Sequence, residues 1–435
     1  MSAITAKASR KMKKYAVLTR EPRCFLGSFD FSWEQRKVGD LLIERNQQAP
    51  MSDEYPLMAF IANEGVAPKG ERYDRSALVT DTVNKLYKKT EKGDFIYSSN
   101  NLETGSIGLN KYGKACISPV YSIFEPTGIA DSDFLGRRLV RKDFINAMVK
   151  WRQGVIYGQW RIHESDFLKI EIPVPSVEEQ RKIGAYLDQL DNLITLHQRK
   201  FEKLTNVKKS MLEKMFPQNG SSYPEIRFKG FTDPWEQRKL GEVLISLQNN
   251  TLSRADLSSE EGIAKNIHYG DILVKFGEVI DVKTESLPMI SDETVIAKYK
   301  SSFLQNGDVI VADTAEDETV GKCTEIAGLS DEIVISGLHT IPYRPLQKYA
   351  PGYLGYYMNS ASFHNQLLPL MQGIKVTSIS KTALQNTDIL YPKSATEQAA
   401  IGTYFRNLDD LITLHQRELE KLQNIKKSML EKMFV

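Results

Sequence analysis

The chain has few cysteines and no long apolar run. Its three cysteines, Cys24, Cys116 and Cys323, are scattered and form no CxxC pair, which excludes a disulfide framework and is typical of a reducing cytoplasm. No apolar stretch approaches the roughly 18 residues that a membrane span needs, and none follows the basic N-terminus as a secretory signal requires. We therefore expect a soluble, cytoplasmic protein without a membrane partner, whose 435 residues form two or three domains.

Signatures of catalysis are also missing. Gly321-Lys322 lacks the upstream glycine of a phosphate-binding loop and is followed by Cys323 rather than Ser or Thr. The sequence contains no Asn-Pro-Pro-aromatic tetrapeptide of the kind that amino-methyltransferases use, and no convincing glycine-rich cofactor turn after a strand. Asp281-Val282-Lys283 matches the end of a nuclease motif, but a lone tripeptide is more simply a strand edge. The net charge of +2 does not by itself indicate nucleic acid.

The dominant feature of the sequence is a duplication. Ser176–Phe216 is repeated as Ser394–Phe434, with "LITLHQR" and "KKSMLEKMF" identical in both copies. Each copy begins with a Ser-x-x-Glu capping box, which marks the start of a helix. Apolar residues then recur at alternating steps of four and three, a period of about 3.5 residues that is typical of a coiled coil. Some forty residues at about 1.5 Å each predict a rod of roughly 60 Å.

A second repeat precedes each rod. "WEQRKVGDLL" at Trp33 returns as "WEQRKLGEVL" at Trp235, and both tryptophans are expected to be buried anchors. The chain therefore reads as module, rod, module, rod. The predicted boundaries are a basic tail at 1–28, module one at 29–175, rod one at 176–216, a linker at 217–230, module two at 231–393 and rod two at 394–435.

The two modules share an order of elements but little sequence. Each alternates short strands with glycine-rich turns. A helix is expected at 144–151 and a helical stretch at 353–371, each before a Gln-Gly pair. Those pairs are Gln153-Gly154 and Gln372-Gly373. Similar rods with dissimilar modules predict one frame that presents two different surfaces.

The repeated "IPVPSVEEQRKIGAYLDQLDNLI…KKSMLEKMF" and "PEIRFKGFTDPWEQRKLGEV" resemble the specificity subunit of type I restriction–modification enzymes. The resemblance implies an α+β chain in which two globular α/β target-recognition domains are joined by two long antiparallel coiled-coil helices with pseudo-twofold symmetry. Each domain would read one half of a split site on double-stranded DNA. Methyltransferase subunits, and through them restriction subunits, would dock on the helices and carry S-adenosylmethionine, ATP and Mg²⁺, with no cofactor, metal or catalytic residue on this chain.

The start of the chain departs from the family pattern. The segment before Trp33 reads "PRCFLGSFDFS" instead of the "PEIRFKGFTDP" that precedes Trp235. The role of the basic tail at 1–28 therefore stays open between phosphate contact and a solvated tail.

Polar and basic side chains on the module loops are the DNA-binding candidates, because Arg, Lys, Asn and Gln match the donors and acceptors of base edges. In module one they are Lys85, Lys88, Lys89, Ser98, Ser99, Asn100, Asn101, Lys111, Tyr112, Arg152, Gln153 and Arg161. In module two they are Lys275, Thr314, Lys322, His339, Gln372, Lys375 and Thr377. The alternative for each is a plain solvated surface residue.

The rods carry polar residues on the seam and apolar residues beside it. His197 and His415 occupy equivalent seam positions, where setting the register is favoured over a metal site because no further ligands are at hand. The apolar stripe is wider than a helix pair needs, which predicts a partner subunit on it. The proposed interface residues are Leu193, Leu196, Val207, Leu411, Leu414 and Ile425.

Two other functions are compatible with the same sequence. A coiled-coil scaffold could use its modules to bind other proteins, and it would not need basic concave faces. A self-contained methyltransferase would have to bind its cofactor as an isolated chain.

Overall fold

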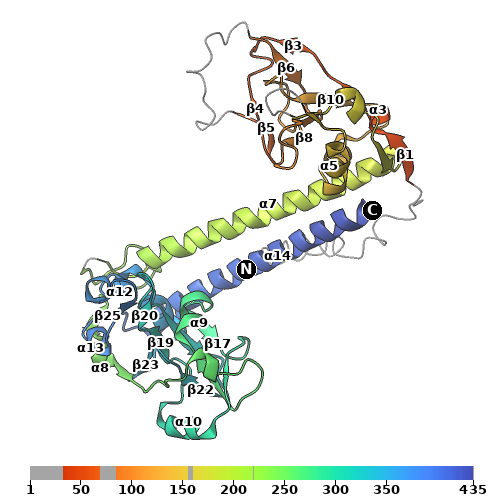
Figure 1. The fold of residues 1–435 in the computed structure, drawn as a ribbon. Coiled ribbons are helices and arrows are strands. Elements are labelled where there is room, and N and C mark those ends of the chain that lie inside the picture. Colours follow the sequence, from red (N-terminus) through yellow and green to blue (C-terminus); the bar gives the residue numbers. More distant parts are fainter. Residues whose placement is uncertain (1–32, 69–84, 155–159, 219, 435) are drawn as a thin grey trace. The chain divides into compact units, whose positions relative to one another are not determined.

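The computed structural model describes residues 33–68, 85–154, 160–218 and 220–434. The chain divides into two compact units, unit 1 (Met1–Thr195 with Glu420–Val435) and unit 2 (Leu196–Leu419). The division falls inside two long helices, α7 (Val177–Lys214) and α14 (Ala395–Met433), which Figure 1 labels. Each unit thus holds one module together with parts of both helices. The predicted basic tail at 1–28 lies outside the described residues.

Both long helices begin where the capping boxes predict. The Ser176 hydroxyl accepts a hydrogen bond from the amide of Glu179, and Ser394 does the same for Glu397. At 38 and 39 residues, the helices fall within the two predicted rods. Hydroxyl capping of this kind satisfies amides that have no partner within the helix.

One glutamine attaches each helix to its module in the same way. Gln180 accepts from the amide of Asp131 at 2.9 Å and donates to the carbonyl of Pro175 at 3.0 Å. Gln398 accepts from Ala350 at 3.0 Å and donates to Pro392 at 2.8 Å. Both side chains are buried, where an amide needs partners for its donor and its acceptor. The repeated glutamine therefore has a structural role, because it attaches each long helix to its module.

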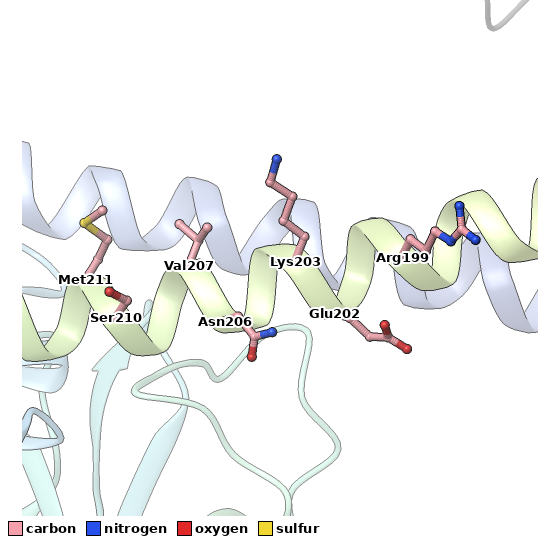
Figure 2. Close-up of a pocket in the computed structure, with 7 residues that line it drawn as sticks. All are labelled: Arg199, Glu202, Lys203, Asn206, Val207, Ser210 and Met211. Carbon is pink, nitrogen blue, oxygen red and sulfur yellow. The ribbon is translucent and has the colours of Figure 1, made fainter. Parts of the chain in front are cut away.

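Within each unit, the segments of α7 and α14 run antiparallel. In unit 2, His197 contacts His415, Lys208 pairs with Asp409 and Phe216 stacks on Phe405, so the order along one helix reverses on the other. In unit 1 a single cluster holds Ile183, Leu187 and Leu190 of α7 with Leu422 and Met429 of α14. Figure 2 shows a shallow groove along α7 in unit 2, lined by Arg199, Glu202, Lys203, Asn206, Val207, Ser210 and Met211.

Unit 1 is built from short strands, as the alternating pattern predicts. The described strands are β1 (Glu34–Lys37), β2 (Leu42–Glu44), β3 (Gln48–Ala49), β4 (Ala59–Ile61), β5 (Gly65–Ala67), β6 (Tyr87–Thr90), β7 (Phe95–Tyr97), β8 (Ile107–Leu109), β9 (Ala115–Ile117), β10 (Ser122–Pro126), β11 (Gln153–Gly154), β12 (Trp160–Arg161) and β13 (Glu171–Val174). They form sheets ordered β2-β10-β7-β8 and β3-β6-β9, with pairs β4-β5, β11-β12 and β1-β13. The short helices are α3 (Val38–Leu41), α4 (Ser132–Arg138), α5 (Lys142–Val149) and α6 (Glu164–Phe167).

An aromatic cluster fills unit 1. Phe95, Phe124 and Phe167 are fully buried, and the Phe124 and Phe167 rings lie 4.6 Å apart. At the helix end of the unit, Trp33 meets Phe134 and Phe434 with ring centroids 5.7 and 6.3 Å apart. The end of α14 is therefore fixed by the first described residue of module one.

Unit 2 repeats the plan with a larger sheet. The strands are β14 (Glu236–Lys239), β15 (Leu244–Ser246), β16 (Ala264–Ile267), β17 (Val279–Asp281), β18 (Met289–Ile290), β19 (Val309–Ala312), β20 (Thr314–Ala315), β21 (Cys323–Ala327), β22 (Ile333–Ser336), β23 (Thr340–Pro345), β24 (Thr377–Ser378) and β25 (Asp388–Tyr391). Their order is β15-β23-β19-β21-β17 and β18-β16-β22, with pairs β20-β24 and β14-β25. The helices are α8 (Leu240–Val243), η4 (Arg254–Asp256), α9 (Tyr269–Val274), α10 (Glu293–Lys298), η5 (Lys300–Ser302), α11 (Tyr353–Met358), α12 (Ala361–His364), η6 (Leu368–Leu370) and α13 (Lys381–Gln385).

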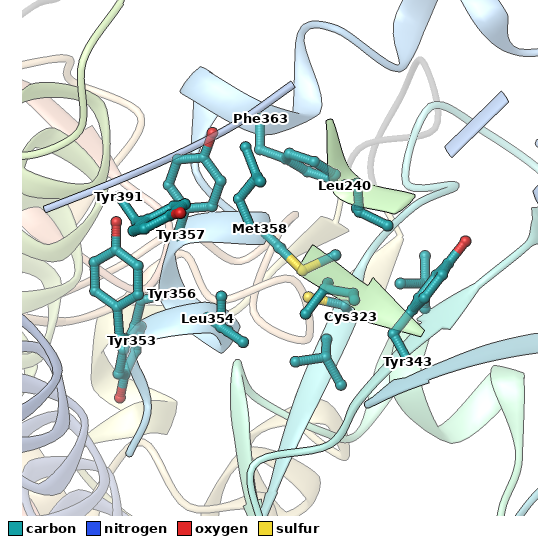
Figure 3. Packing of buried hydrophobic residues seen from close by; sticks show 14 of the residues in the cluster. Leu240, Cys323, Tyr343, Tyr353, Leu354, Tyr356, Tyr357, Met358, Phe363 and Tyr391 are labelled. Carbon is teal, nitrogen blue, oxygen red and sulfur yellow. The ribbon is translucent and has the colours of Figure 1, made fainter. Parts of the chain in front are cut away.

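Tyrosines of α11 dominate the core of unit 2. Tyr353, Tyr356 and Tyr357 are buried, and Figure 3 shows them beside Leu354 and Phe363. Phe216 lies among them, 6.2 Å from the ring of Trp235, which is 3% exposed. Trp235 is a buried core anchor, as predicted, whereas Trp33 is only partly buried and packs against the core of unit 1.

The helical stretch predicted at 353–371 is present but is divided into three pieces. Residues 353–371 form α11, α12 and η6 rather than one helix. Ser360 takes an extended backbone between the first two, with φ −75° and ψ 157°, and Pro369 inside η6 cannot donate the amide that a longer helix needs. The shorter helix expected at 144–151 is present as α5.

Candidate nucleic-acid interface

A Gly-Asp pair opens the central strand of each module. Gly93 and Gly307 have φ values of 96° and 91°, which side chains disfavour, and the following Asp94 and Asp308 are buried. Asp94 pairs with Arg45 at 2.9 Å and Asp308 with Arg344 at 2.7 Å. Burial raises the pKa of both carboxyls even though the arginines oppose it. This anchored start fixes where the loop after each strand emerges.

In unit 1 the loop after β7 meets the antiparallel pair of strands β11 and β12, called the hairpin below. The Ser99 hydroxyl accepts from the amide of Ile162 at 3.0 Å, and the Asn100 side chain accepts from the amide of Trp160 at 2.6 Å. The Arg152 guanidinium donates to the carbonyl of Ser99 at 3.1 Å. Strand pairing sets Gln153 opposite Arg161. The predicted residues brought together here are Ser98, Ser99, Asn100, Asn101, Arg152, Gln153 and Arg161.

Not all of these side chains face solvent. Ser98 is buried, and Arg152 makes two hydrogen bonds to the Glu103 carboxylate at 2.7 and 2.6 Å, so its charge is already paired. Gln153 and Arg161 are exposed, as is the neighbouring Trp160 at 50%. The outer residues of the cluster, not its paired arginine, are the ones available to a ligand.

The remaining candidates of unit 1 lie elsewhere. Lys85 and Lys89 lie over the rings of Tyr87 and Tyr55, and Lys88 on the same strand is buried. Lys111 lies 3.8 Å from Asp188 of α7, and the exposed Tyr112 follows it. These five residues lie on or next to β6 and in the loop after β8, and not on the loop after β7, β11 or β12.

In unit 2 the equivalent loop pairs with the segment after Gln372. Strand β20 pairs with β24, which sets Ala315 opposite Thr377 and Thr314 opposite Ser378. Gln372 and Ser378 exchange backbone hydrogen bonds at 2.9 and 2.8 Å and close the turn between them. The turn carries Lys375 between two exposed apolar side chains, Ile374 at 102% and Val376 at 54%. Gly373 has φ 115°, which the sharp turn requires.

His339 joins the same cluster from the turn between β22 and β23. Its Nδ1 lies 3.4 Å from Asp313 Oδ1 and 3.4 Å from Thr314 Oγ1. The ring of Tyr269 meets the imidazole edge to face at 5.2 Å. Five predicted residues are thus gathered at this end of unit 2: Thr314, His339, Gln372, Lys375 and Thr377.

Lys275 and Lys322 lie beside α9, outside this cluster. Lys275 donates to the carbonyl of Ser286 at 2.6 Å and lies 3.6 Å from Glu285. Lys322 donates to the carbonyl of Leu273 at 2.9 Å, and burial lowers its pKa. Lys322 is therefore a less available DNA ligand than its charge indicated.

Several residues of these clusters were not predicted from the sequence. Asp313, Trp160, Ile374 and Val376 are acidic or largely apolar, whereas the predicted candidates were basic or uncharged polar side chains. Their position was the available signal: Asp313 directly precedes Thr314, and the two apolar residues flank Lys375.

The predicted partner face divides into two groups. Leu196, Leu411 and Leu414 are exposed at 37%, 43% and 42%, all within unit 2. Leu193 and Ile425 pack against the core cluster of unit 1, and Val207 packs against that of unit 2. Only the first group is classed as exposed and leaves apolar surface for another chain to cover.

The two seam histidines contact each other directly. His197 Nδ1 and His415 Nδ1 lie 3.1 Å apart, and partial burial lowers the pKa of both rings. Among the described residues, no group of three or more His, Cys, Asp or Glu side chains could hold a metal ion. No helix in that part of the chain is long and apolar enough to cross a membrane.

Comparison with known proteins identifies the class. Residues 32–206 and 232–424 each match the family model described as "Type I restriction modification DNA specificity domain". The chain is thus a protein of two DNA specificity domains, one in each half of the sequence. It belongs to the type I restriction–modification DNA specificity family.

The chain is also similar to individual proteins. The "Type I restriction enzyme MjaVIII specificity subunit" of Methanocaldococcus jannaschii is 24% identical over 414 residues, covering 92% of this chain and 91% of the relative. The HsdS subunit of Thermoanaerobacter tengcongensis has a similar solved structure, with 18% identity, TM-score 0.45 and coverage of 94% and 98%. The S subunit from M. genitalium gives 14% identity, TM-score 0.49 and coverage of 94% and 97%.

Proposed function

We propose that the chain is the sequence-specific DNA-recognition subunit of a type I restriction–modification system and reads an asymmetric site in two parts. The observation that carries this proposal is the loop–hairpin cluster found in both modules at the same place after the Gly-Asp strand. The backbone plan is shared, but one cluster offers Asn100, Gln153 and Arg161 and the other Thr314, His339 and Gln372. Different donors and acceptors on one scaffold favour different base sequences.

The two long helices would form the coiled-coil spacer between these reading surfaces. Support comes from an ion pair that occurs once within each unit. Lys208 pairs with Asp409 in unit 2, and Lys426 pairs with Asp191 at the equivalent helix positions in unit 1. We infer a pseudo-twofold arrangement from this repetition. A rigid spacer would set the distance between half-sites, which recur on one face of DNA about every 34–36 Å.

Methyltransferase subunits would dock on the exposed leucines of the helices, and restriction subunits would join through them. Leu196, Leu411 and Leu414 support this, because apolar side chains grouped on a helix pair favour a protein partner. The role of this chain is recognition and not catalysis, which agrees with the family to which it belongs. S-adenosylmethionine, ATP and Mg²⁺ would be held by the partner subunits.

Mapping of methylated adenines tests the proposal. The chain would be expressed with its methyltransferase subunit in a host without other methylation, and methylated sites would be read by single-molecule sequencing. We expect one motif with two defined parts and an undefined spacer. Replacing residues 231–393 with another module should change one part only. A change in both parts, or no motif at all, would contradict the proposal.

A further inference from the structure

The backbone of His339 is unusual for a residue with a side chain. Its φ is 54°, in the left-handed region, and among the described non-glycine residues only Asn63 shares a positive φ. The conformation is held from both sides: the carbonyl of His339 accepts from the amide of Asp313 at 3.1 Å, and the neighbouring Thr340 is buried. Strained backbone that the surroundings fix is common at functional sites.

Three neighbours orient the imidazole. Asp313 and Thr314 lie on the Nδ1 side, and Tyr269 packs against the ring. The side chain is nevertheless 47% exposed, and in the described part of the chain Nε2 has no hydrogen-bond partner. The ring is thus positioned by the protein with one nitrogen toward solvent, which is the arrangement of a preorganised contact residue.

The hydrogen-bond network sets the tautomer of the neutral ring. Thr314 Oγ1 donates its only hydrogen to Asp313 Oδ1 at 2.8 Å, so toward His339 the hydroxyl can only accept. The Asp313 carboxylate is also an acceptor. Both neighbours of Nδ1 therefore require Nδ1 to carry the proton, which leaves Nε2 as a hydrogen-bond acceptor.

We propose that His339 is a specificity-determining residue whose Nε2 accepts a hydrogen bond from an exocyclic amino group in the major groove, adenine N6 or cytosine N4. These are the amino donors that base pairs present in the major groove, whereas guanine offers only acceptors, N7 and O6, at that edge. The inference rests on the proposed DNA-recognition function and assigns one contact within it. Asp313 and Thr314 act as positioning residues.

The test uses variants that respect the backbone. His339→Gly removes the imidazole and tolerates the left-handed conformation, so the fold should be unchanged. Glu293→Gln, on the surface helix α10, serves as the matched control. Each full-length variant would be co-expressed with the methyltransferase subunit and its methylated motif mapped. We expect His339→Gly to relax one adenine or cytosine position in one part of the motif, and Glu293→Gln to change nothing.

Base analogues then identify the group that is read. Binding of the assembled methyltransferase would be measured on DNA in which the relaxed base lacks its amino group, with purine for adenine or 2-pyrimidinone for cytosine. We expect about a ten-fold loss for the wild type and none for His339→Gly, as for one base contact. A loss caused instead by 7-deazaguanine would mean that Nε2 donates, and would overturn the assignment.

The outcomes separate the two levels of the proposal. An unaltered motif in His339→Gly, with a normal wild-type motif, overturns the role of His339 and leaves DNA recognition standing. Absence of any motif in the wild type contradicts the proposed function itself. Thermal unfolding of His339→Gly that matches the wild type excludes misfolding as the cause of a relaxed motif.

Discussion

A lysine of one long helix pairs with an aspartate of the other at two places, one in each unit. The two pairs occupy equivalent positions of the repeat, but the modules place opposite charges beside them. In unit 2, Lys208 pairs with Asp409 and also with Glu278, each at 2.6 Å. In unit 1, Lys426 pairs with Asp191 at 2.5 Å, but the module adds Arg137, 2.9 Å from the same carboxylate. One module contributes an acid and the other a base. The duplicated helices therefore provide the frame, and the modules determine how strongly each lysine is needed.

Removal of each lysine should reveal the largest difference in stability between the two units. Lys208→Met leaves two carboxylates in a mostly buried site without their cation, and we expect a cost of about 3–5 kcal/mol in the stability of unit 2. Lys426→Met leaves Asp191 with Arg137, and about 1 kcal/mol or less is expected. Hydrogen exchange of peptides from each unit measures both effects in the full chain. Equal losses would show that the module partners do not matter.

The pH dependence of stability should also differ between the units. Glu325 in unit 2 is 3% exposed, and burial raises its pKa to about 7, although the amides of Gly352 and Gly355 donate to it at 2.6 and 2.9 Å. Because the folded pKa lies above the unfolded value of 4.5, the stability from this group is present below pH 4.5 and is lost as pH rises toward 7.

We expect a loss of about 3 kcal/mol from unit 2 across that window. Glu325→Gln keeps the shape of the side chain and should flatten the dependence. Hydrogen exchange at pH values from 4.5 to 7, corrected for intrinsic rates, measures it. An unchanged slope in the variant would refute the role of Glu325.

The two units also differ in how far the leucines on the helix surface are exposed. Leu193 and Leu411 are equivalent in the repeat, yet Leu193 packs against a core cluster whereas Leu411 is 43% exposed. Leu411→Asp with Leu414→Asp should weaken co-purification with the methyltransferase subunit about ten-fold or more, because burying one leucine contributes about 1.5–3 kcal/mol. Circular dichroism of the isolated chain should stay unchanged.

Leu193→Asp, at the equivalent position in unit 1, is the variant to compare with these. It should reduce the stability of unit 1 in addition to any effect on assembly, since a charge would enter a packed cluster. If the chain with Leu411→Asp and Leu414→Asp assembles normally, the exposed leucines are not part of the docking surface.

A smaller effect than that of Lys208 is expected at two glycines of the repeat. A Cβ added at Gly402 would lie 2.6 Å from the carbonyl oxygen of Pro351, which cannot move freely, whereas at Gly184 the nearest atom is Asp131 Oδ1 at 3.0 Å. Gly402→Ala should cost about 1–3 kcal/mol from overpacking. In Gly184→Ala the gain in helix propensity, about 1 kcal/mol, should largely offset the crowding. Urea unfolding of both variants tests the difference.

Local patterns in the sequence predicted the frame of this protein well. Capping serines and a sustained apolar period define α7 and α14 because both signals act between near neighbours in the chain. The helical stretch at 353–371 was predicted, but its division at Ser360 and Pro369 was not, because the helical composition of the stretch gave no sign of it. The domain boundaries and the coiled-coil character of the helices stay predictions.

The candidate site was less predictable because its chemistry depends on distant pairing. Arg152 is held by Glu103, and Lys322 donates to the carbonyl of Leu273, so neither charge is as available as its residue type indicated. The left-handed backbone of His339 could not be inferred from its sequence, since Gly337 two residues earlier is the expected turn residue. Which loop faces which hairpin is decided by strand pairing and is not encoded near either segment.

In each unit, the end of a long helix packs on a tryptophan of the repeat. The rings of Phe216 and Trp235 lie 6.2 Å apart in unit 2, and those of Phe434 and Trp33 lie 6.3 Å apart in unit 1. A short peptide linker connects only the first of these pairs, so the contact does not depend on a nearby covalent connection. Proteolytic cleavage within 217–230 should therefore leave Phe216 packed on Trp235.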